Sequence, residues 1–445
     1  MLIKNVYVVD PYSNEEGVKD IRIENEKILE VKDHLDAKES GSKDVTGAKE
    51  INSEDLAGIG KSDSKDVIDG SGLVLLPGLL DVHVHFRDPG FTHKEDMFTG
   101  AKVAARGGFT RVVLMANTNP TVDNVETLKY VLEKGSKTGI KVLTCASVTK
   151  GLKGEELVDF DTLYKEGAVG FTDDGIPLMD ENILKEAFIK ARKLNVPISL
   201  HEEDKRLIHE NGINAGKASA YYGITGSPRE AEYTLVKRDT DLAIETGATL
   251  DIQHISAKES VEIVRQARKK NANIFAEVTP HHIALTEDAV IEYGSNAKMN
   301  PPLRTDEDRK AIIEGIKDST IGIIATDHAP HSVEEKSGEI TKAPSGIIGL
   351  ETAFSVAYDN LVKVGHISLM ELARMFTVNP SKLYGFEPSP IKEGYDADFA
   401  LVDLNSDWTF DKSVSKSCNS PFLGKTFSAS VVKTICKGKV IYEKV

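Results

Sequence analysis

The chain has 445 residues, 40% of them hydrophobic, and a formal net charge of −15 at pH 7. This length exceeds that of most single domains, so we expect one large domain with a smaller companion. The acidic balance argues against nucleic acid as a partner, because binding to phosphates requires clustered Lys and Arg side chains.

The cysteines and the apolar runs indicate the compartment. The three cysteines, Cys145, Cys418 and Cys436, have neither paired nor Cys-x-x-Cys spacing, which is typical of a reducing compartment and argues against a thiolate zinc site. The N-terminus lacks the pattern of a signal peptide, and no apolar run reaches the length of about 18 residues that a membrane span requires. We therefore expect a cytoplasmic protein with no membrane partner.

Both ends of the chain predict short strands. Residues 2–9 and 20–31 alternate apolar and polar side chains, and residues 391–403 and 431–442 return to this pattern. We expect these segments to pair into a small β-sandwich made of residues 1–75 and 391–445. Residues 32–65 are rich in charged and small side chains and predict a solvated loop, to which we assign no function.

The central region, residues 76–390, alternates short apolar runs with helix-like segments. No Gly-x-Gly-x-x-Gly fingerprint follows a strand, which disfavours an open doubly wound sheet. Eight strand–helix units instead predict an α/β fold, a closed (β/α)8 barrel of the TIM type. The expected strands are 79–85, 111–116, 141–147, 167–172, 197–202, 249–255, 273–279 and 320–326, and the expected helices are 94–106, 124–137, 155–166, 180–194, 228–247, 259–270 and 305–317.

The first expected barrel strand ends in two histidines, His83 and His85. Residues two apart on a strand point to the same face, so the two imidazoles would lie side by side, as metal ligands do. Alone, this pair is weak evidence, because histidines at strand ends are often merely hydrogen-bonded. Five later polar residues lie at or just after the ends of expected strands: Asn117, Asp174, His201, His254 and Asp327.

These polar side chains should meet in space, because the C-terminal ends of barrel strands converge on one mouth. Singly, His201 or His254 could be a core histidine and Asp174 a loop cap. Together, so many buried polar groups would each need a hydrogen-bond partner, which favours a metal site.

The type of ligand selects the metal and the reaction. Imidazole and carboxylate without thiolate suit Zn²⁺, Mn²⁺, Co²⁺ or Fe²⁺. Four His and two Asp exceed the needs of one ion, so we expect two ions, about 3.5 to 4 Å apart, which activate a water and polarise a carbonyl group. The sequence therefore predicts hydrolysis of an amide or ester, or the reverse reaction, with Asp327 as general base.

Longer motifs relate the chain to a known family. They are His-Val-His-Phe-Arg-Asp-Pro-Gly at 83–90, Met-Ala-Asn-Thr-Asn-Pro at 115–120, Phe-Thr-Asp-Asp-Gly at 171–175, Glu-Val-Thr-Pro-His-His at 277–282, Lys-Met-Asn-Pro-Pro-Leu-Arg at 298–304 and Ala-Thr-Asp-His-Ala-Pro-His at 325–331. Through these motifs the chain resembles the amidohydrolase superfamily and, within it, the dihydroorotases of the bacterial type I class.

The resemblance implies the residues of the site and its cofactor. The cofactor would be two Zn²⁺ ions, with Mn²⁺ or Co²⁺ as substitutes, and Asp327 would be the catalytic acid/base. Asp173 competes with Asp174 as a ligand, and the family's spacing to His201 favours Asp174. The implied metal ligands are His83, His85, Asp174, His201, His254 and Asp327, and the implied substrate contacts are His85, Arg87, Asn117, Asn300, His331, Ser345 and Gly346.

The implied reaction is the reversible cyclisation of N-carbamoyl-L-aspartate to L-dihydroorotate, a small-molecule substrate of pyrimidine synthesis. Hydantoinases, dihydropyrimidinases and allantoinases typically carry a bridging lysine where this chain has Asp174, and their substrates do not need the contacts to a ring carboxylate that Arg87 and Asn117 offer. Such a cyclic amidase stays open as an alternative, as does a catalytically silent scaffold homologue. The expected protein partner is a second copy in a homodimer or aspartate carbamoyltransferase.

Overall fold

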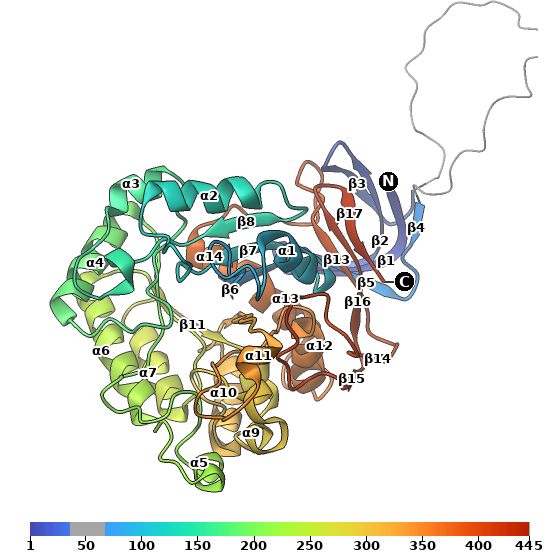
Figure 1. Cartoon of the computed structure of the whole chain (residues 1–445). Helices are drawn as coiled ribbons and strands as arrows, with labels where there is room; N and C mark the ends of the chain where they lie inside the picture. The colour runs from blue at the N-terminus through green and yellow to red at the C-terminus, as the bar shows by residue number, and fades with distance from the viewer. Residues whose placement is uncertain (36–66, 445) are drawn as a thin grey trace, which may run out of the picture.

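The computed structural model describes residues 1–35 and 67–444 (Figure 1). A barrel of strands and surrounding helices lies beside a sheet that both ends of the chain build, and both termini lie at this sheet. Residues 36–65 of the expected solvated loop lie outside the described residues.

Short parallel strands form the barrel wall. They are β6 (Leu79–Val84), β7 (Phe109–Leu114), β8 (Lys141–Thr144), β9 (Ile198–Leu200), β10 (Leu250–Ile252), β11 (Ile274–Val278) and β12 (Ile323–Ile324). β6, β7 and β8 pair in one sheet, and β9 to β12 pair in another. Parallel bridges join the two sheets, because Phe171 pairs with both Ala146 and Ile198, and Val84 pairs with His328. The ring therefore closes, as the sequence predicts.

The prediction of a regular strand at 167–172 is wrong. Its one bridging residue stands where a fourth barrel strand would lie, although the Val169 N–H still donates to the Thr144 carbonyl at 3.1 Å. Gly167 and Gly170 offer no side chain to pack, and glycine in a strand weakens pairing. The segment nevertheless keeps its place in the wall.

Helices cover the outside of the barrel. Several begin at a capping side chain, such as Asp96 before α1 and Thr305 before α10, each of which accepts a hydrogen bond from a free N–H of the first turn. The helices are α1 (Met97–Arg106), α2 (Val125–Gly135), α3 (Phe160–Lys165), α4 (Glu181–Leu194), α5 (Lys217–Tyr222), α6 (Glu230–Thr246), α7 (Lys258–Arg268), α8 (Pro280–Ala284), α9 (Asp288–Tyr293), α10 (Asp306–Lys317), α11 (Val333–Lys336), α12 (Ala353–Ala357), α13 (Leu369–Phe376) and α14 (Val378–Tyr384), with shorter turns η2 (Lys150–Leu152), η3 (Gly294–Ala297) and η4 (Tyr358–Val362). Within the described residues, none of them is long and apolar enough to cross a membrane.

Both ends of the chain pair in one sheet. Its strands are β1 (Leu2–Asp10), β2 (Glu15–Glu24), β3 (Lys27–Lys32), β4 (Val67–Asp69), β5 (Leu73–Pro77), β13 (Phe399–Asp403), β16 (Ser430–Cys436) and β17 (Lys439–Glu443), and β14 (Trp408–Thr409) pairs with β15 (Thr426–Phe427) beside it. The order is β17-β16-β13-β5-β1-β2-β3, with β4 beside β1. The expected strand at 20–31 is wrong as one strand: it is the hairpin of β2 and β3, because Asn25 and Glu26 have φ of 47° and 70° and reverse the chain.

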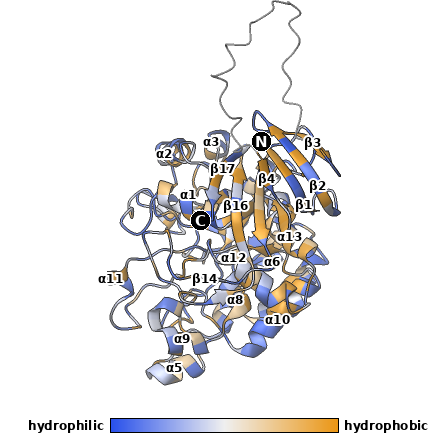
Figure 2. Ribbon diagram, turned by 90° about the vertical axis from the view of Figure 1, so that its right-hand side faces the viewer, coloured by the Kyte–Doolittle hydropathy of each residue, from blue (hydrophilic) through white to orange (hydrophobic). Residues whose placement is uncertain are grey.

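Alternating residues of this sheet face two cores. Val74 and Val402 belong to the large core of the barrel, whereas Leu75 and Leu401 join a second, smaller core with Ile3 and other strand residues. Figure 2 shows hydrophobic residues, in orange, interspersed with hydrophilic ones along the strands of the sheet. One face of the sheet therefore anchors it to the barrel. The domain limits at 75/76 and 390/391 stay a prediction.

Candidate active site

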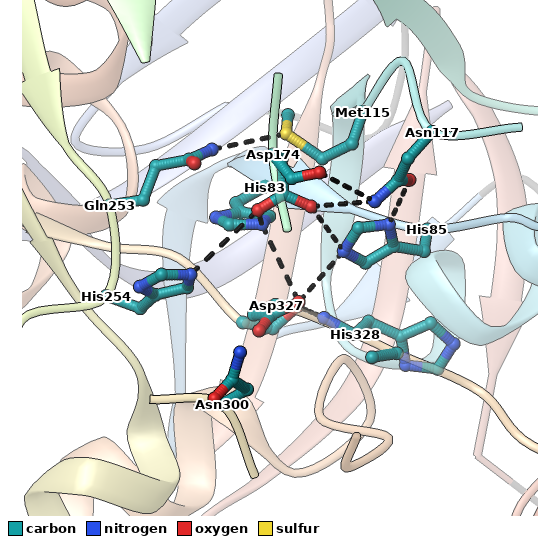
Figure 3. A network of polar contacts seen from close by, with 12 residues as sticks. His83, His85, Met115, Asn117, Asp174, Gln253, His254, Asn300, Asp327 and His328 are labelled. Atoms are coloured by element: carbon teal, nitrogen blue, oxygen red, sulfur yellow. Dashed lines mark hydrogen bonds and ion pairs between the residues drawn. The ribbon is translucent and has the colours of Figure 1, made fainter. Parts of the chain in front are cut away.

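Six polar side chains meet at the mouth of the barrel. His83 lies on β6, and the others follow strand ends, where the chain leaves the wall and its side chains turn inward. Their ligand atoms form three groups, each with all atoms within 4.8 Å of one another: His83, His85 and Asp174; His83, His254 and Asp327; and Asp174, His201 and His254. Figure 3 shows five of the six close together: His83, His85, Asp174, His254 and Asp327.

Two carboxylates lie close to both His83 and His85. The Nε2 atom of His85 is 2.9 Å from Asp327 Oδ1 and 3.5 Å from Asp174 Oδ2. The Nε2 atom of His83 is 3.3 Å from Asp174 Oδ1 and 3.6 Å from Asp327 Oδ1. Each imidazole therefore faces both carboxylates.

His201 and His254 form the other half of the site. The Nδ1 atom of His201 is 2.9 Å from the Nε2 atom of His254. Both of these nitrogen atoms lie 3.9 Å from Asp174 Oδ1. Asp174 is therefore the residue that both halves share.

The electrostatics of this cluster fit a divalent cation. The Nε2 atom of His83 is buried and has no hydrogen-bond partner among the described residues, although it faces Asp174 and Asp327. Burial lowers the pKa of His83, but the two carboxylates outweigh this effect and raise the pKa well above its usual value. Burial, together with His201 and His83, lowers the pKa of His254 far below its usual value and keeps a lone pair available. Two carboxylates that favour positive charge, beside an imidazole that keeps a free lone pair, are a donor set for metals such as Zn²⁺.

Asp173 and Asp174 point to different places. The Asp173 carboxylate accepts hydrogen bonds from the N–H groups of Val148 and Thr149, at 2.7 and 3.1 Å, and from the Thr149 hydroxyl. It therefore ties down the loop after β8. This geometry supports Asp174, rather than Asp173, as the residue at the site.

Polar partners orient the histidines. Asn117, predicted as a substrate contact, reaches two residues of the cluster: its Oδ1 is 3.0 Å from His85 Nδ1, and its Nδ2 donates to Asp174 Oδ2 at 2.9 Å. Glu277 Oε2 lies 3.1 Å from His83 Nδ1, and Glu203 Oε2 lies 3.1 Å from His201 Nε2. Such partners fix the orientation of a ligating ring and its tautomer.

The sequence analysis did not single out Glu277 or Glu203. A signal was present for both. Glu277 is the penultimate residue of β11 and belongs to the motif at 277–282, and Glu203 follows His201 by two residues. The pairing of either carboxylate with an imidazole depends on the direction of the side chain, which the sequence does not show.

Three site residues have backbone in the left-handed region. Arg87, His254 and Asp327 have φ of 58°, 34° and 44°. For residues other than glycine this conformation costs on the order of 1–3 kcal/mol, and it persists where the surrounding structure holds it for function.

A cavity of about 360 Å³ opens beside the cluster. Arg87, Asn300, His331 and Ser345 line it, as expected for substrate contacts, together with Asn211. The Nδ2 atom of Asn300 is 3.2 Å from His201 Nε2. The described part of the chain offers the buried Asn300 Oδ1 no hydrogen-bond partner.

Arg87 and His331 form one wall of this cavity. The Arg87 Nε atom donates to the Pro330 carbonyl at 3.2 Å, and its guanidinium lies 3.4 Å from His331 Nε2. Burial, Arg87 and Lys94 lower the pKa of His331 to about 2. A neutral imidazole and a guanidinium therefore stand together at this wall.

Ser345 and Gly346, the last two of the implied substrate contacts, differ in how free they are. Ser345 lines the cavity, but the Gly346 N–H donates to the Lys298 carbonyl at 2.9 Å. Residue 346 turns toward Lys298 because the loop runs back beside the segment that carries Asn300.

The comparisons with known proteins first define the class. Residues 74–441 match the description of the amidohydrolase family. An L-hydantoinase (dihydropyrimidinase) from Arthrobacter aurescens shares the fold with a TM-score of 0.83 at 23% identity, over 100% of this chain and 96% of that one. A dihydropyrimidinase from Brevibacillus agri NCHU1002 has a TM-score of 0.81 at 22% identity, over 99% and 95%.

Relatives in sequence narrow the class. A curated dihydroorotase from Clostridioides difficile is 50% identical over 442 residues, which covers 99% of each chain. One from Clostridium acetobutylicum is 46% identical over 445 residues, 100% of this chain and 99% of that one. The chain therefore belongs to the amidohydrolase family and, within it, to the dihydroorotases. It is an enzyme of the cyclic amidase type.

Proposed function

We propose that the chain catalyses the reversible cyclisation of N-carbamoyl-L-aspartate to L-dihydroorotate, with the six converging residues as metal ligands. One observation carries this proposal: the His and Asp cluster opens onto a cavity whose other wall bears the guanidinium of Arg87. The cluster suits hydrolysis of an amide, and the guanidinium suits a substrate with a carboxylate.

We propose two Zn²⁺ ions, for which Mn²⁺ or Co²⁺ can substitute. His83, His85 and Asp327 would hold one ion, and His201 and His254 the other. Asp174 would reach both, since its Oδ1 lies 3.3 Å from His83 Nε2 and 3.9 Å from the His254 nitrogen. When bound, the ions supply an activated water and polarise the ring carbonyl.

Asp327 is the proposed acid/base. In the ring-opening direction its carboxylate takes a proton from the attacking water and delivers it to the ring nitrogen as the carbon–nitrogen bond breaks. In cyclisation the ureido nitrogen bonds to the carbon of the carboxyl group, Asp327 takes the proton from that nitrogen, and it returns the proton to the hydroxyl that departs as water when the carbon–oxygen bond breaks. Its hydrogen bond with His85 Nε2, at 2.9 Å, holds the carboxylate beside the site.

Arg87 is the proposed anchor for the ring carboxylate, with Asn117, Asn300 and His331 as further donors. A guanidinium matches a carboxylate through two parallel hydrogen bonds. Neutral His331 can donate one N–H without adding charge. This wall separates the proposal from a hydantoinase, dihydropyrimidinase or allantoinase, whose rings lack this carboxylate.

The test is a panel of substrates with the metal-loaded protein: L-dihydroorotate, dihydrouracil, hydantoin and allantoin. We expect turnover of L-dihydroorotate alone, and a large loss of it in Arg87→Ala. Arg206→Ala, on an exposed side chain of a nearby loop, serves as the matched control and should keep the wild-type rate. Equal turnover of an uncharged ring would favour the alternative amidase.

The scaffold alternative and the protein partners need separate measurements. A silent scaffold would bind no metal and show no turnover after Zn²⁺ or Mn²⁺ is added. We also propose that the chain acts in the cytoplasm, as a homodimer or together with aspartate carbamoyltransferase. Light scattering of the purified chain, alone and mixed with that enzyme, tests these associations.

A further inference from the structure

A strap of residues 337–346 connects the two ends of the substrate wall. It begins after α11, a few residues past His331, and ends at Ser345 and Gly346. Its outer residues are exposed, while Ile340 packs against a small hydrophobic cluster that includes residues of α5 and α9. The path of the strap decides where Ser345 lies.

Lys298 holds the strap from below. The residue is 3% exposed, and its ammonium donates to the carbonyls of Ala343 at 2.6 Å, Ile340 at 2.8 Å and Thr341 at 3.4 Å. Its own carbonyl accepts the Gly346 N–H at 2.9 Å. Because Lys298 lies two residues before Asn300, it ties the strap to a segment with another proposed substrate contact.

Lys336 and Asn419 hold the end of the strap. The buried Lys336 ammonium donates to the carbonyls of Pro344 and Gly346 at 2.9 and 3.0 Å. The Asn419 amide donates to the carbonyls of Ala329 and Gly346, at 3.0 and 2.9 Å, and its Oδ1 accepts the His331 N–H at 3.1 Å. Asn419 therefore links the backbone of His331 to that of Gly346.

The two buried ammonium groups depend on these hydrogen bonds to carbonyls. Within residues 1–35 and 67–444, neither ammonium forms an ion pair with a carboxylate, so the carbonyls are its partners. Burial lowers the pKa of Lys298 to about 8 and that of Lys336 to about 7, which shows how far each amine lies from solvent. A buried cation needs its hydrogen bonds, and those bonds in turn restrict where the carbonyls can lie.

We propose that Lys298, Lys336 and Asn419 are positioning residues that hold the strap so that Ser345 and His331 face the substrate. This inference rests on the proposed function, because it needs the substrate to contact this wall. None of the three side chains has to contact the reacting atoms of the substrate for this role. Their loss should weaken substrate binding more than it slows the chemical step.

The test compares Lys298→Met with Lys342→Met. Both variants remove an ammonium from the same region, but Lys342 is exposed and pairs with Glu339 on the surface of the strap. For Lys298→Met we expect KM for L-dihydroorotate to rise at least about tenfold, the effect of about one lost charged hydrogen bond, with kcat within about threefold of wild type. Lys342→Met should keep both constants.

Two further measurements separate positioning from general destabilisation. Amide hydrogen exchange of residues 338–346, measured without substrate, should become faster in Lys298→Met and in Lys336→Met, while metal content stays unchanged. If both variants keep the wild-type KM, or if the rate of strap exchange does not change, the proposal is wrong. A wild-type protein that does not turn over L-dihydroorotate would instead overturn the proposed function, and the exchange experiment would still report whether the lysines hold the strap.

Discussion

The two walls of the active-site mouth are built in different ways. On the side of the His and Asp cluster, His83, His201, His254 and Asp327 are placed by the ends of packed strands. On the strap side, buried side chains such as Lys298 place loop backbone by binding its carbonyls. Strands pack into the core and resist movement, whereas a loop held by a few hydrogen bonds depends on each of them. Changes in the first wall should therefore affect the chemistry, and changes in the second should affect binding.

The largest effect is expected for Asp327→Ala. Removal of the proposed acid/base should lower kcat by about 10²- to 10⁴-fold while much of the affinity for substrate remains. Steady-state kinetics, together with calorimetric binding of L-dihydroorotate, measures the two effects separately. A near-native kcat would show that the strand-end wall does not carry the proton transfer.

Asp174 and Asp173 offer a comparison between adjacent carboxylates. Asp174→Asn should lower both metal content and kcat, because its Oδ1 lies near ligand atoms of both halves. Asp173→Asn should keep the metal, because this side chain binds the backbone of Val148 and Thr149 instead. Elemental analysis of the two purified variants measures their metal content. Metal loss in Asp173→Asn alone would show that Asp173, and not Asp174, binds the metal.

Glu277→Gln should have a moderate effect. The carboxylate lies 3.1 Å from His83 Nδ1, and loss of such an orienting partner typically costs about 10- to 100-fold in metal affinity or activity. Competition with a chelator measures the affinity. Glu314→Gln on an exposed face of α10 is the control. Equal metal affinity in the two variants would show that Glu277 does not support metal binding through His83.

The smallest effect is expected where the sheet meets the barrel. Hydrogen bonds from Lys141 and Lys27 lower the pKa of Asp396 to about 2. A lowered carboxylate pKa adds stability above the ordinary pKa, and this stability is lost as the pH falls toward 2. Because the Asp396 side chain is 33% exposed, Asp396→Asn should lower the free energy of unfolding by only about 1 kcal/mol at pH 7.

Urea unfolding at pH 7 and at pH 3 measures this difference between wild type and Asp396→Asn. The difference should shrink at pH 3, because this pH lies below the ordinary pKa, so the unfolded chain protonates this carboxyl while the folded carboxylate stays largely ionised. A difference that is the same at both values would mean that the ion pairs contribute nothing and that the variant perturbs packing.

The contrast between the walls also explains what the sequence could predict. His83 and His85 were predicted as neighbours because they lie two apart at the end of an apolar run, and the same logic placed His201, His254 and Asp327 at one mouth. The fold followed from the alternation of strands and helices. The periodicity is local in the sequence. The convergence of the strand ends follows from the barrel fold that this periodicity predicts.

Other features depend on contacts between distant residues. The pairing of Glu277 with His83 joins positions far apart in the chain, and so does the link from Asn419 to His331. The missing strand at 167–172 reflects glycines within an apolar run. Asn25 favours the left-handed turn that divides 20–31 into two strands. The alternation of apolar and polar residues continues on both sides of it, so the sequence predicted one strand.

The central claim is that the converging His and Asp residues hold two ions that both support turnover. The most direct test is to titrate Zn²⁺ into the metal-free protein while calorimetry counts the bound ions and the rate of L-dihydroorotate hydrolysis is followed. We predict that the amount of bound Zn²⁺ and the rate both rise until two equivalents are bound. Full activity at one equivalent, with no further rise as the second ion binds, would contradict it.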